Sequence, residues 1–277
     1  MRAMAAGVLE VEREPGIALV TIDSPPLHLV DGPFLGALLE LLPELEADDD
    51  LRVAVFRSAD PDFFLMHGDV EALLASTPAP GAPVTEPNFA AAAFERIHRA
   101  RFVTIGVLDG AARGGGCEFL SALDLRLGTP RAVIGQPEVP VGILPGAGGT
   151  VRWARSVGRA KALELLLTGR DVGADEALQL GWLLAIHDPA DIDAAALDLA
   201  RSIARMSGAS IAAVKHVVDV ALGSNSDALV AESDALMSLM AARNHVEPMR
   251  RFLAAGGQTR DAERDDFAGV IDRMFAS

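Results

Sequence analysis

The chain has 277 residues, of which 50% are apolar and 23% charged, a composition that indicates a folded globular protein and argues against disorder. Its net charge of −15 makes nucleic acid a poor partner, because phosphate binding draws on clustered lysine and arginine. The longest stretch without charged residues, 72–85, is too short and too rich in proline to cross a bilayer, and no long apolar run follows Arg2, so we expect a cytoplasmic protein with neither a membrane helix nor a secretory signal.

The first elements predict a strand, an amphipathic helix and a second strand. Segments 16–23 and 52–57 are short, apolar and rich in β-branched residues, which is typical of buried strands. Between them, apolar residues recur at helical spacing after Asp31, Gly32 and Pro33. A proline near the first turn marks a helix start, so we expect the helix to begin there.

The chain then loosens before it returns to regular structure. A surface loop is expected over 75–87, where proline, alanine and glycine follow no period. Helical spacing resumes over 89–98. The run 104–108 is expected to be a strand that leads into Gly110 and the triple glycine 114–116.

From Gly148 onward the pattern indicates helices, and no further strand of comparable quality is expected. The predicted helices cover 160–167, 174–181, 191–205, 211–222 and 227–243. A terminal helix is expected where apolar residues from Phe267 to Phe275 recur at helical spacing. The expected fold class is therefore mixed α/β followed by helices, with a core of residues 1–207 and a helical region of residues 208–277.

Residues suited to chemistry concentrate in three segments, 62–69, 109–118 and 135–150. Their glycines match neither the G-x-G-x-x-G dinucleotide fingerprint nor the Gly-Lys-Ser/Thr of a nucleotide P-loop. A glycine run on its own is consistent with a tight turn and nothing more. A second interpretation is that these glycines open a helix over 117–123, whose unpaired N–H groups and dipole would receive an oxyanion.

Proton transfer in this chain would fall to carboxylates. The chain has one cysteine, two lysines and no tyrosine, and its six histidines show no paired ligand spacing, so we expect no disulfide, metal site or redox centre. Glu118 lies one turn from the glycines, and Glu138 stands in an otherwise apolar stretch. Either could be an ordinary helix-end or surface residue, but two carboxylates beside an oxyanion site favour acid–base work on a carbonyl compound.

At these residues the sequence resembles the crotonase, or enoyl-CoA hydratase/isomerase, superfamily. The resemblance covers about residues 8–208 and is strongest in DGAARGGGCEF and IGQPEVPVGILPGAGGTVRW, which are similar to the paired glycine signature of that family, with the usual spacing of 20 residues from Glu118 to Glu138. It implies a crotonase-like spiral of β-β-α units, a helical C-terminal region that builds homotrimers or dimers of trimers, and an acyl-CoA thioester as substrate. Because CoA arrives as part of the substrate, no further cofactor is implied.

The same resemblance implies roles for individual residues. The two oxyanion donors of the family fall on Gly68 and Gly115, and its two catalytic glutamates fall on Glu118 and Glu138. Further substrate-binding positions are Met66, His67, Asp69, Gly114 and Gly146. Together they imply hydration of a 2-enoyl-CoA to a 3-hydroxyacyl-CoA, or the reverse. The alternatives are an enoyl-CoA double-bond isomerase that uses Glu138 alone and a non-catalytic acyl-CoA-binding subunit.

Departures from the family pattern bear mainly on CoA recognition. Glu71 stands where many members carry a lysine that contacts the CoA phosphates, and no lysine follows Lys215. The usual Pro-x-x-Asn-Ala-Leu is replaced by PPLHLV at 25–30. His67 stands where glycine or alanine is common, and we expect it to line the pocket or to hydrogen-bond within its loop rather than to act catalytically. The two retained glutamates favour an enzyme over a binding subunit.

Overall fold

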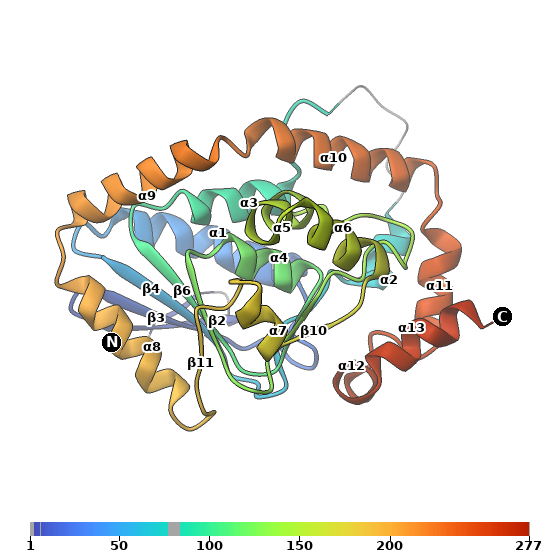
Figure 1. Cartoon of the computed structure of the whole chain (residues 1–277), viewed down its shortest axis with the longest axis horizontal. Helices are drawn as coiled ribbons and strands as arrows, with labels where there is room; N and C mark the ends of the chain where they lie inside the picture. The colour runs from blue at the N-terminus through green and yellow to red at the C-terminus, as the bar shows by residue number, and fades with distance from the viewer. Residues whose placement is uncertain (1–2, 6, 77–83, 277) are drawn as a thin grey trace.

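Two sheets form the centre of the computed structural model, which describes residues 3–5, 7–76 and 84–276 (Figure 1). The larger sheet has seven strands in the order β1-β2-β3-β4-β6-β8-β11, and the smaller has four in the order β10-β9-β7-β5. The strands of the larger sheet are β1 (Ala3–Ala5), β2 (Leu9–Glu14), β3 (Ile17–Ile22), β4 (Val53–Ser58), β6 (Val103–Leu108), β8 (Leu125–Gly128) and β11 (Ala185–Ile186). Those of the smaller sheet are β5 (Phe63–Leu65), β7 (Ala111–Arg113), β9 (Val133–Gly135) and β10 (Val172–Gly173).

The chain alternates between the two sheets as it advances. Strands β4, β6 and β8 run parallel in the larger sheet, and the strands that follow each of them, β5, β7 and β9, run parallel in the smaller one. The carboxyl ends of β5, β7 and β9 therefore lie at one edge of the smaller sheet. Segments 66–69, 114–118 and 136–138, which hold most of the predicted site residues, leave from that edge.

Helices cover both sheets and extend beyond them (Figure 1). They are α1 (Gly32–Ala47), α2 (Val70–Ala75), α3 (Phe89–His98), α4 (Gly115–Ala122), α5 (Gly149–Val157), α6 (Arg159–Thr168), α7 (Ala174–Gln179), α8 (Ile192–Ala204), α9 (Gly208–Leu222), α10 (Ser226–Ala241), α11 (Val246–Ala254), α12 (Arg260–Asp265) and α13 (Phe267–Phe275). Helices α9 and α10 follow one another along one side of the molecule, and α11 to α13 gather at one end. Among the described residues, no helix combines the length and the apolar content that crossing a bilayer requires.

Side chains of β4 enter two different cores. Ala54 and Phe56 face the main core with α1 and α4, whereas Val53 and Val55 face a second core that α8 covers. Because both faces of the strand are buried, its apolar residues form a continuous run instead of alternating with polar ones.

Helix α4 is held rigidly in the main core. Phe119 lies among four other phenylalanine rings, Phe34, Phe56, Phe64 and Phe94, with ring centroids between 5.3 and 6.4 Å away. Most such edge-on and stacked pairs contribute beyond their buried area, about 1 kcal/mol each. The neighbour of Phe119 in the chain, Glu118, is thereby fixed in place.

The structure agrees with most of the predicted elements. The strands expected over 16–23, 52–57 and 104–108 are β3, β4 and β6, and the helix expected after Pro33 is α1. At its start the Asp31 side chain accepts a hydrogen bond from the N–H of Phe34 at 2.9 Å, the N-cap arrangement. The helix predicted over 117–123 begins two residues earlier.

One prediction for the second half was wrong. The half after Gly148 holds two strands, β10 and β11, besides its helices. Each has two residues, too few for any periodic pattern, and each exists because a longer strand lies beside it. The loop predicted over 75–87 falls partly on 77–83, outside the described residues.

The C-terminal helices share a core with earlier parts of the chain. Met249, Phe252 and Val270 pack with Val70 of α2 and with Ile143. The division predicted at 207 and 208 coincides with the start of α9, and it stays a prediction. These contacts place α11 beside the loops that leave the smaller sheet.

Candidate active site

The triple glycine joins β7 to α4 under tight steric limits. Gly114 has a φ of +53°, in the region that favours glycine. A side chain on Gly116 would place its Cβ 1.8 Å from the carbonyl oxygen of Leu65 in β5. Both glycines are therefore required by the backbone, and the turn they form starts α4 at the edge where β5, β7 and β9 end.

Glu118, in the first turn of α4, reaches the start of another helix. Its Oε1 accepts hydrogen bonds from the N–H groups of Ala147 at 2.7 Å and Gly149 at 2.8 Å, where α5 begins. The residue is buried. Burial raises the pKa of Glu118 to about 7, although these two N–H groups and the charge of Arg152 act in the opposite direction.

Glu138 enters the same space from the loop after β9. The Gln136 amide, oriented by the groups around it, donates to the carboxylate oxygens of Glu138 at 3.1 and 3.3 Å. Burial, reinforced by repulsion from Glu118, raises the pKa of Glu138 well above its ordinary value of 4.5. The two glutamates are therefore coupled, and Glu138 keeps its proton more readily than an exposed glutamate.

A third buried glutamate, Glu232 of α10, joins this cluster. Its carboxylate accepts from the N–H of Gly148 at 2.5 Å and of Val151 at 3.2 Å. The amino end of α5 thus divides its N–H groups between Glu118 and Glu232. Burial and repulsion from Glu118 raise the pKa of Glu232 to about 8. Glu232 was not predicted from the sequence, because nothing in the local pattern of α10 separates it from a surface glutamate.

Two backbone N–H groups are free to receive an oxyanion. Gly115 is the first residue of α4, so its N–H has no acceptor within the helix. Within the described part of the chain, neither Gly68 nor Gly115 donates its N–H in a hydrogen bond, while the neighbouring Gly114 and Gly116 donate to Gly135 and Met66. Of these four glycines, the two predicted donors are the ones whose N–H groups are not used within the described residues.

A cavity of about 380 Å³ brings these groups together, a size suited to a small organic ligand. Of the predicted residues, six line it: His67, Gly68, Gly115, Glu118, Glu138 and Gly146. Most of the remaining wall is aliphatic or aromatic, and includes Val30, Leu35, Val70, Leu73, Val141, Ile143, Leu144, Leu236, Met237, Met240, Met249 and Phe252. An apolar cavity with a few convergent polar groups is the usual form of a binding site for a largely apolar ligand.

Three predicted substrate-binding residues do not line the cavity. Met66 is buried in a small core with Phe63. Asp69 caps α2, where it accepts from the N–H of Glu71 at 3.0 Å. Gly114 lies behind the wall, because a Cβ there would sit 2.7 Å from Glu138 Oε1. Their place is to shape the loops that carry Gly68 and Gly115.

The C-terminal helices supply a part of the cavity wall that was not predicted from the sequence. Leu236 and Met240 of α10 and Phe252 of α11 face the cavity from more than ninety residues beyond Glu138. Leu236 lies so close to Gly146 that an added Cβ would come within 2.2 Å of it. The sequence shows the helical spacing of these residues, but it does not show that they cover this cavity.

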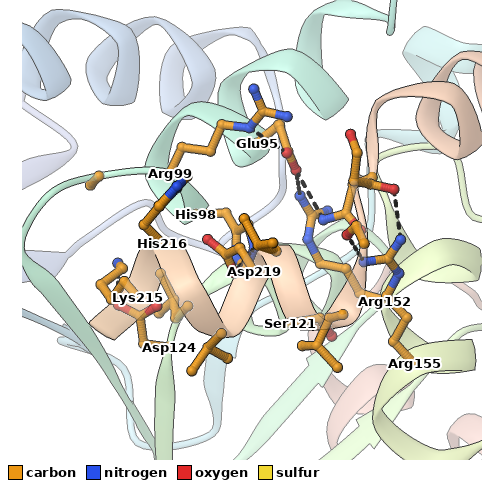
Figure 2. Close-up of a pocket in the computed structure, with 18 of the residues that line it drawn as sticks. Glu95, His98, Arg99, Ser121, Asp124, Arg152, Arg155, Lys215, His216 and Asp219 are labelled. Carbon is orange, nitrogen blue, oxygen red and sulfur yellow. Dashed lines mark hydrogen bonds and ion pairs between the residues drawn. The ribbon is translucent and has the colours of Figure 1, made fainter. Parts of the chain in front are cut away.

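A second hollow, of about 680 Å³, lies between α9 and the core (Figure 2). Its charged groups already pair with one another: Arg152 with Glu95 at 2.8 Å, Arg99 with Glu95 at 2.8 Å, Lys215 with Asp124 at 2.6 Å and His98 with Asp219 at 3.4 Å. The Arg155 guanidinium donates to the carbonyl oxygens of Gly223 and Ser224. The ion pairs and hydrogen bonds in this hollow therefore attach the α9–α10 connection to the core. The smaller cavity is the candidate active site.

A family model described as enoyl-CoA hydratase/isomerase matches residues 12–258, which is most of the chain. The chain belongs to the enoyl-CoA hydratase/isomerase family. The family membership predicted from the glycine segments is thus confirmed. Membership of this family indicates an enzyme and does not decide between hydratase and isomerase.

Solved structures of similar proteins confirm the fold class. A protein from Streptomyces avermitilis assigned as an enoyl-CoA hydratase is 32% identical, with a TM-score of 0.86 over 97% of this chain and 98% of that one. DspI of Pseudomonas aeruginosa is 32% identical, with a TM-score of 0.71 over 78% of this chain and 87% of that one. An enoyl-CoA hydratase from Bacillus halodurans, 20% identical, shares the fold with a TM-score of 0.77, over 88% of this chain and 99% of that one. The mixed α/β fold of β-β-α units expected of a crotonase is therefore correct.

Proposed function

We propose that this protein hydrates 2-enoyl-CoA thioesters to 3-hydroxyacyl-CoA, or catalyses the reverse. The observation that carries the proposal is the convergence, in one apolar cavity, of two free N–H donors and two buried glutamates. The thioester oxygen would accept from Gly68 and Gly115. Loss of one such donor typically costs about 3 kcal/mol of barrier, so the pair supplies a large share of the rate enhancement.

The two glutamates divide the proton transfers. Glu118 takes a proton from water as the water oxygen bonds to the β carbon of the enoyl group, and Glu138 gives its proton to the α carbon. The electron pair of the double bond passes through the enolate held by the N–H groups and ends in the new C–H bond. The net change is addition of one water, and the proton left on Glu118 returns to Glu138 before the next turnover.

This division of labour agrees with the electrostatics of the site. Glu118 holds two N–H donors on one oxygen, which favours its ionised form, whereas Glu138 has the charge of Glu118 to oppose its ionisation. An ionised base beside a protonated acid is the state that hydration needs. An isomerase would need Glu138 to begin ionised, which this arrangement disfavours.

Association through α9 is also part of the proposal. Val214, Val217 and Val220 are each 64 to 65% exposed on α9, whereas Leu229 and Met240 of α10 are buried within this chain. An exposed apolar row of this kind is typical of an interface. Together with the family resemblance, which implies homotrimers or dimers of trimers, this row leads us to expect such an assembly in the cytoplasm, and a chain ending near Gly208 should lose it. Sedimentation as a monomer of about 29.0 kDa at micromolar concentration would contradict this.

The decisive experiment is a panel of 2-enoyl-CoA thioesters of increasing chain length. Loss of the enoyl thioester absorbance with a product heavier by one water identifies a hydratase; an unchanged mass with a shifted double bond identifies an isomerase. Glu118→Gln and Glu138→Gln should each lower turnover by about two to four orders of magnitude, whereas Glu44→Gln on the exposed side of α1 should leave it unchanged. Wild-type turnover in both active-site variants would refute the assignment, and binding without turnover by the wild type would indicate a non-catalytic subunit.

A further inference from the structure

The His67 ring contacts hydrogen-bond acceptors at both of its nitrogens. Nδ1 lies 2.8 Å from the carbonyl oxygen of Gly68, and Nε2 lies 3.0 Å from Oε1 of Glu263. A neutral imidazole carries a hydrogen on one nitrogen only, so it can satisfy one of these contacts but not both. Burial acts to raise the pKa of Glu263, but His67, Arg113 and the N–H of Gln258 outweigh it and the pKa is lowered, so the carboxylate acts as an acceptor. With Glu263 ionised, only the doubly protonated imidazolium satisfies both contacts; it is buried in the cavity wall one residue before the candidate donor Gly68.

Glu263 also contacts the segment that carries the second candidate donor. Arg113, the last residue of β7, donates from Nη1 to the carbonyl oxygen of Glu263 at 2.7 Å and lies 3.6 Å from its carboxylate. Gly114 and Gly115 follow directly in the chain. One residue of α12 thus contacts both backbone segments that carry the candidate donors.

A second residue of the C-terminal segment strengthens this connection. The side chain of Gln258 accepts from the N–H of Val70 at 2.7 Å and donates to Asp69 at 2.9 Å, and its own N–H donates to Oε1 of Glu263 at 3.1 Å. Residues 67–70 are therefore attached at several points to residues 258–263. The side chain of Glu263 is 1% exposed, so these contacts are shielded from water.

We propose that Glu263 is a positioning residue that keeps His67 as an imidazolium and holds the loops of Gly68 and Gly115 at a fixed separation. The proposal rests on the proposed function, because it assumes that these two glycines receive the thioester oxygen. The ion pair presents its positive end to the cavity, since His67 lines it and Glu263 does not. A fixed positive charge in a site that excludes water favours the developing enolate.

The charges around His67 are consistent with this protonation state. Burial by itself would lower the pKa of His67, but the charge and hydrogen bond of Glu263 outweigh it, and the pKa is raised above 6.5. Arg113 acts against this, although Asp171 pairs with its guanidinium at 2.7 Å. Glu138 is a further neighbour of His67, because a Cβ on Gly114 would lie 2.7 Å from Glu138 Oε1 and 2.8 Å from the Cβ of His67. The pKa of His67 is therefore shifted toward the imidazolium, in agreement with the two acceptors at its ring nitrogens.

The first test is spectroscopic and needs no substrate. Ring ¹⁵N shifts of the ¹⁵N-histidine-labelled full-length protein would be followed from pH 5.5 to 9, with the His67 signals assigned by their loss in His67→Gln. We expect both His67 nitrogens to be protonated at pH 7 in the wild type, and the titration to move to lower pH in Glu263→Gln. The matched control is Asp261→Asn, which removes a charge that is 91% exposed on the same helix, and should leave the titration in place. A neutral His67 at pH 7 in the wild type overturns the proposal, even if Glu263→Gln does not fold.

The second test is kinetic and separates positioning from simple stability. Glu263→Gln should lower kcat by about ten- to a hundredfold with a smaller change in KM, as expected when donors move by a fraction of an ångström. The alkaline limb of its kcat profile should move to lower pH, whereas that of Asp261→Asn should not move. A Glu263→Gln profile that superimposes on the wild type refutes the proposal. If the wild type turns over no enoyl-CoA while His67 titrates as expected, the proposed function fails and the charge assignment stands.

Discussion

Replacing Glu118 by glutamine should stabilise the fold above neutral pH while removing turnover. Glutamine keeps a carbonyl oxygen for the N–H groups of Ala147 and Gly149 but carries no charge to bury. In the wild type, the buried carboxyl group holds its proton up to about pH 7, whereas the unfolded chain releases it near 4.5. The unfolded state therefore binds fewer protons between these values, and the free energy of unfolding falls as the pH rises.

The size of the effect follows from the two pKa values. Moving the pKa from 4.5 to about 7 corresponds to about 3 kcal/mol of lost stability once the pH lies above both. Glu118→Gln should regain this, so its advantage over the wild type should be below about 1 kcal/mol at pH 5 and near 3 kcal/mol at pH 8. Relief of repulsion on Glu138 and Glu232 acts in the same direction.

Urea unfolding at pH 5 and pH 8 would measure this difference, at one fixed protein concentration. The buried tryptophans Trp153 and Trp182 provide the fluorescence signal. Glu44→Gln, which removes an exposed glutamate, should behave as the wild type at both pH values. The reasoning is refuted if Glu118→Gln is no more stable than the wild type at pH 8, or if its advantage is the same at both pH values.

Three further outcomes are expected. Turnover should rise about tenfold between pH 6 and pH 8 as Glu118, with its pKa of about 7, becomes ionised, and should fall again where Glu138 or the His67 imidazolium loses its proton. A flat kcat profile between pH 6 and pH 8 would contradict the role of Glu118. Gly116→Ala should not fold, because its methyl group would lie 1.8 Å from a carbonyl oxygen of β5. Gly115→Ala, whose methyl group meets a valine side chain at 3.0 Å, should fold but lose turnover. Circular dichroism and kcat would be measured for both variants, and equal behaviour of the two would contradict separate roles for these glycines. Leu236→Ala should shift preference toward longer acyl chains by enlarging the cavity, and an unchanged chain-length profile would show that the acyl group lies elsewhere.

Local patterns were enough to predict the part of the site that belongs to the spiral. The strand at 104–108, the glycines after it and Glu118 lie within fifteen residues, and their order along the chain fixes their order in space. Glu138 follows β9, which pairs with β7, so the two glutamates reach one edge of one sheet. Such short-range relations are visible in a sequence because the backbone alone imposes them.

Contacts between distant segments were not predictable in the same way. Glu232 and Glu263 reach the site across 84 and 196 residues, to Gly148 and His67 respectively. Each stands on a helix with other acidic residues and has no feature of its own in the sequence. What distinguishes them is burial, which depends on how α10 and α12 dock on the spiral. The strands β10 and β11 were missed for a related reason, because only their pairing defines them.

Part of the cavity wall comes from a later stretch of the gene than the reactive groups. The glutamates and N–H donors lie between 68 and 138, whereas five apolar residues of the wall lie between 236 and 252. Randomising the codons of the later stretch would therefore change the chain-length preference and leave the glutamates and N–H donors unaltered. A crossover placed in α9 would combine the later wall residues of one relative with the glutamates and N–H donors of another. Because Glu232 binds the amino end of α5, functional recombinants should be those in which the incoming α10 supplies an equivalent acceptor for the N–H of Gly148.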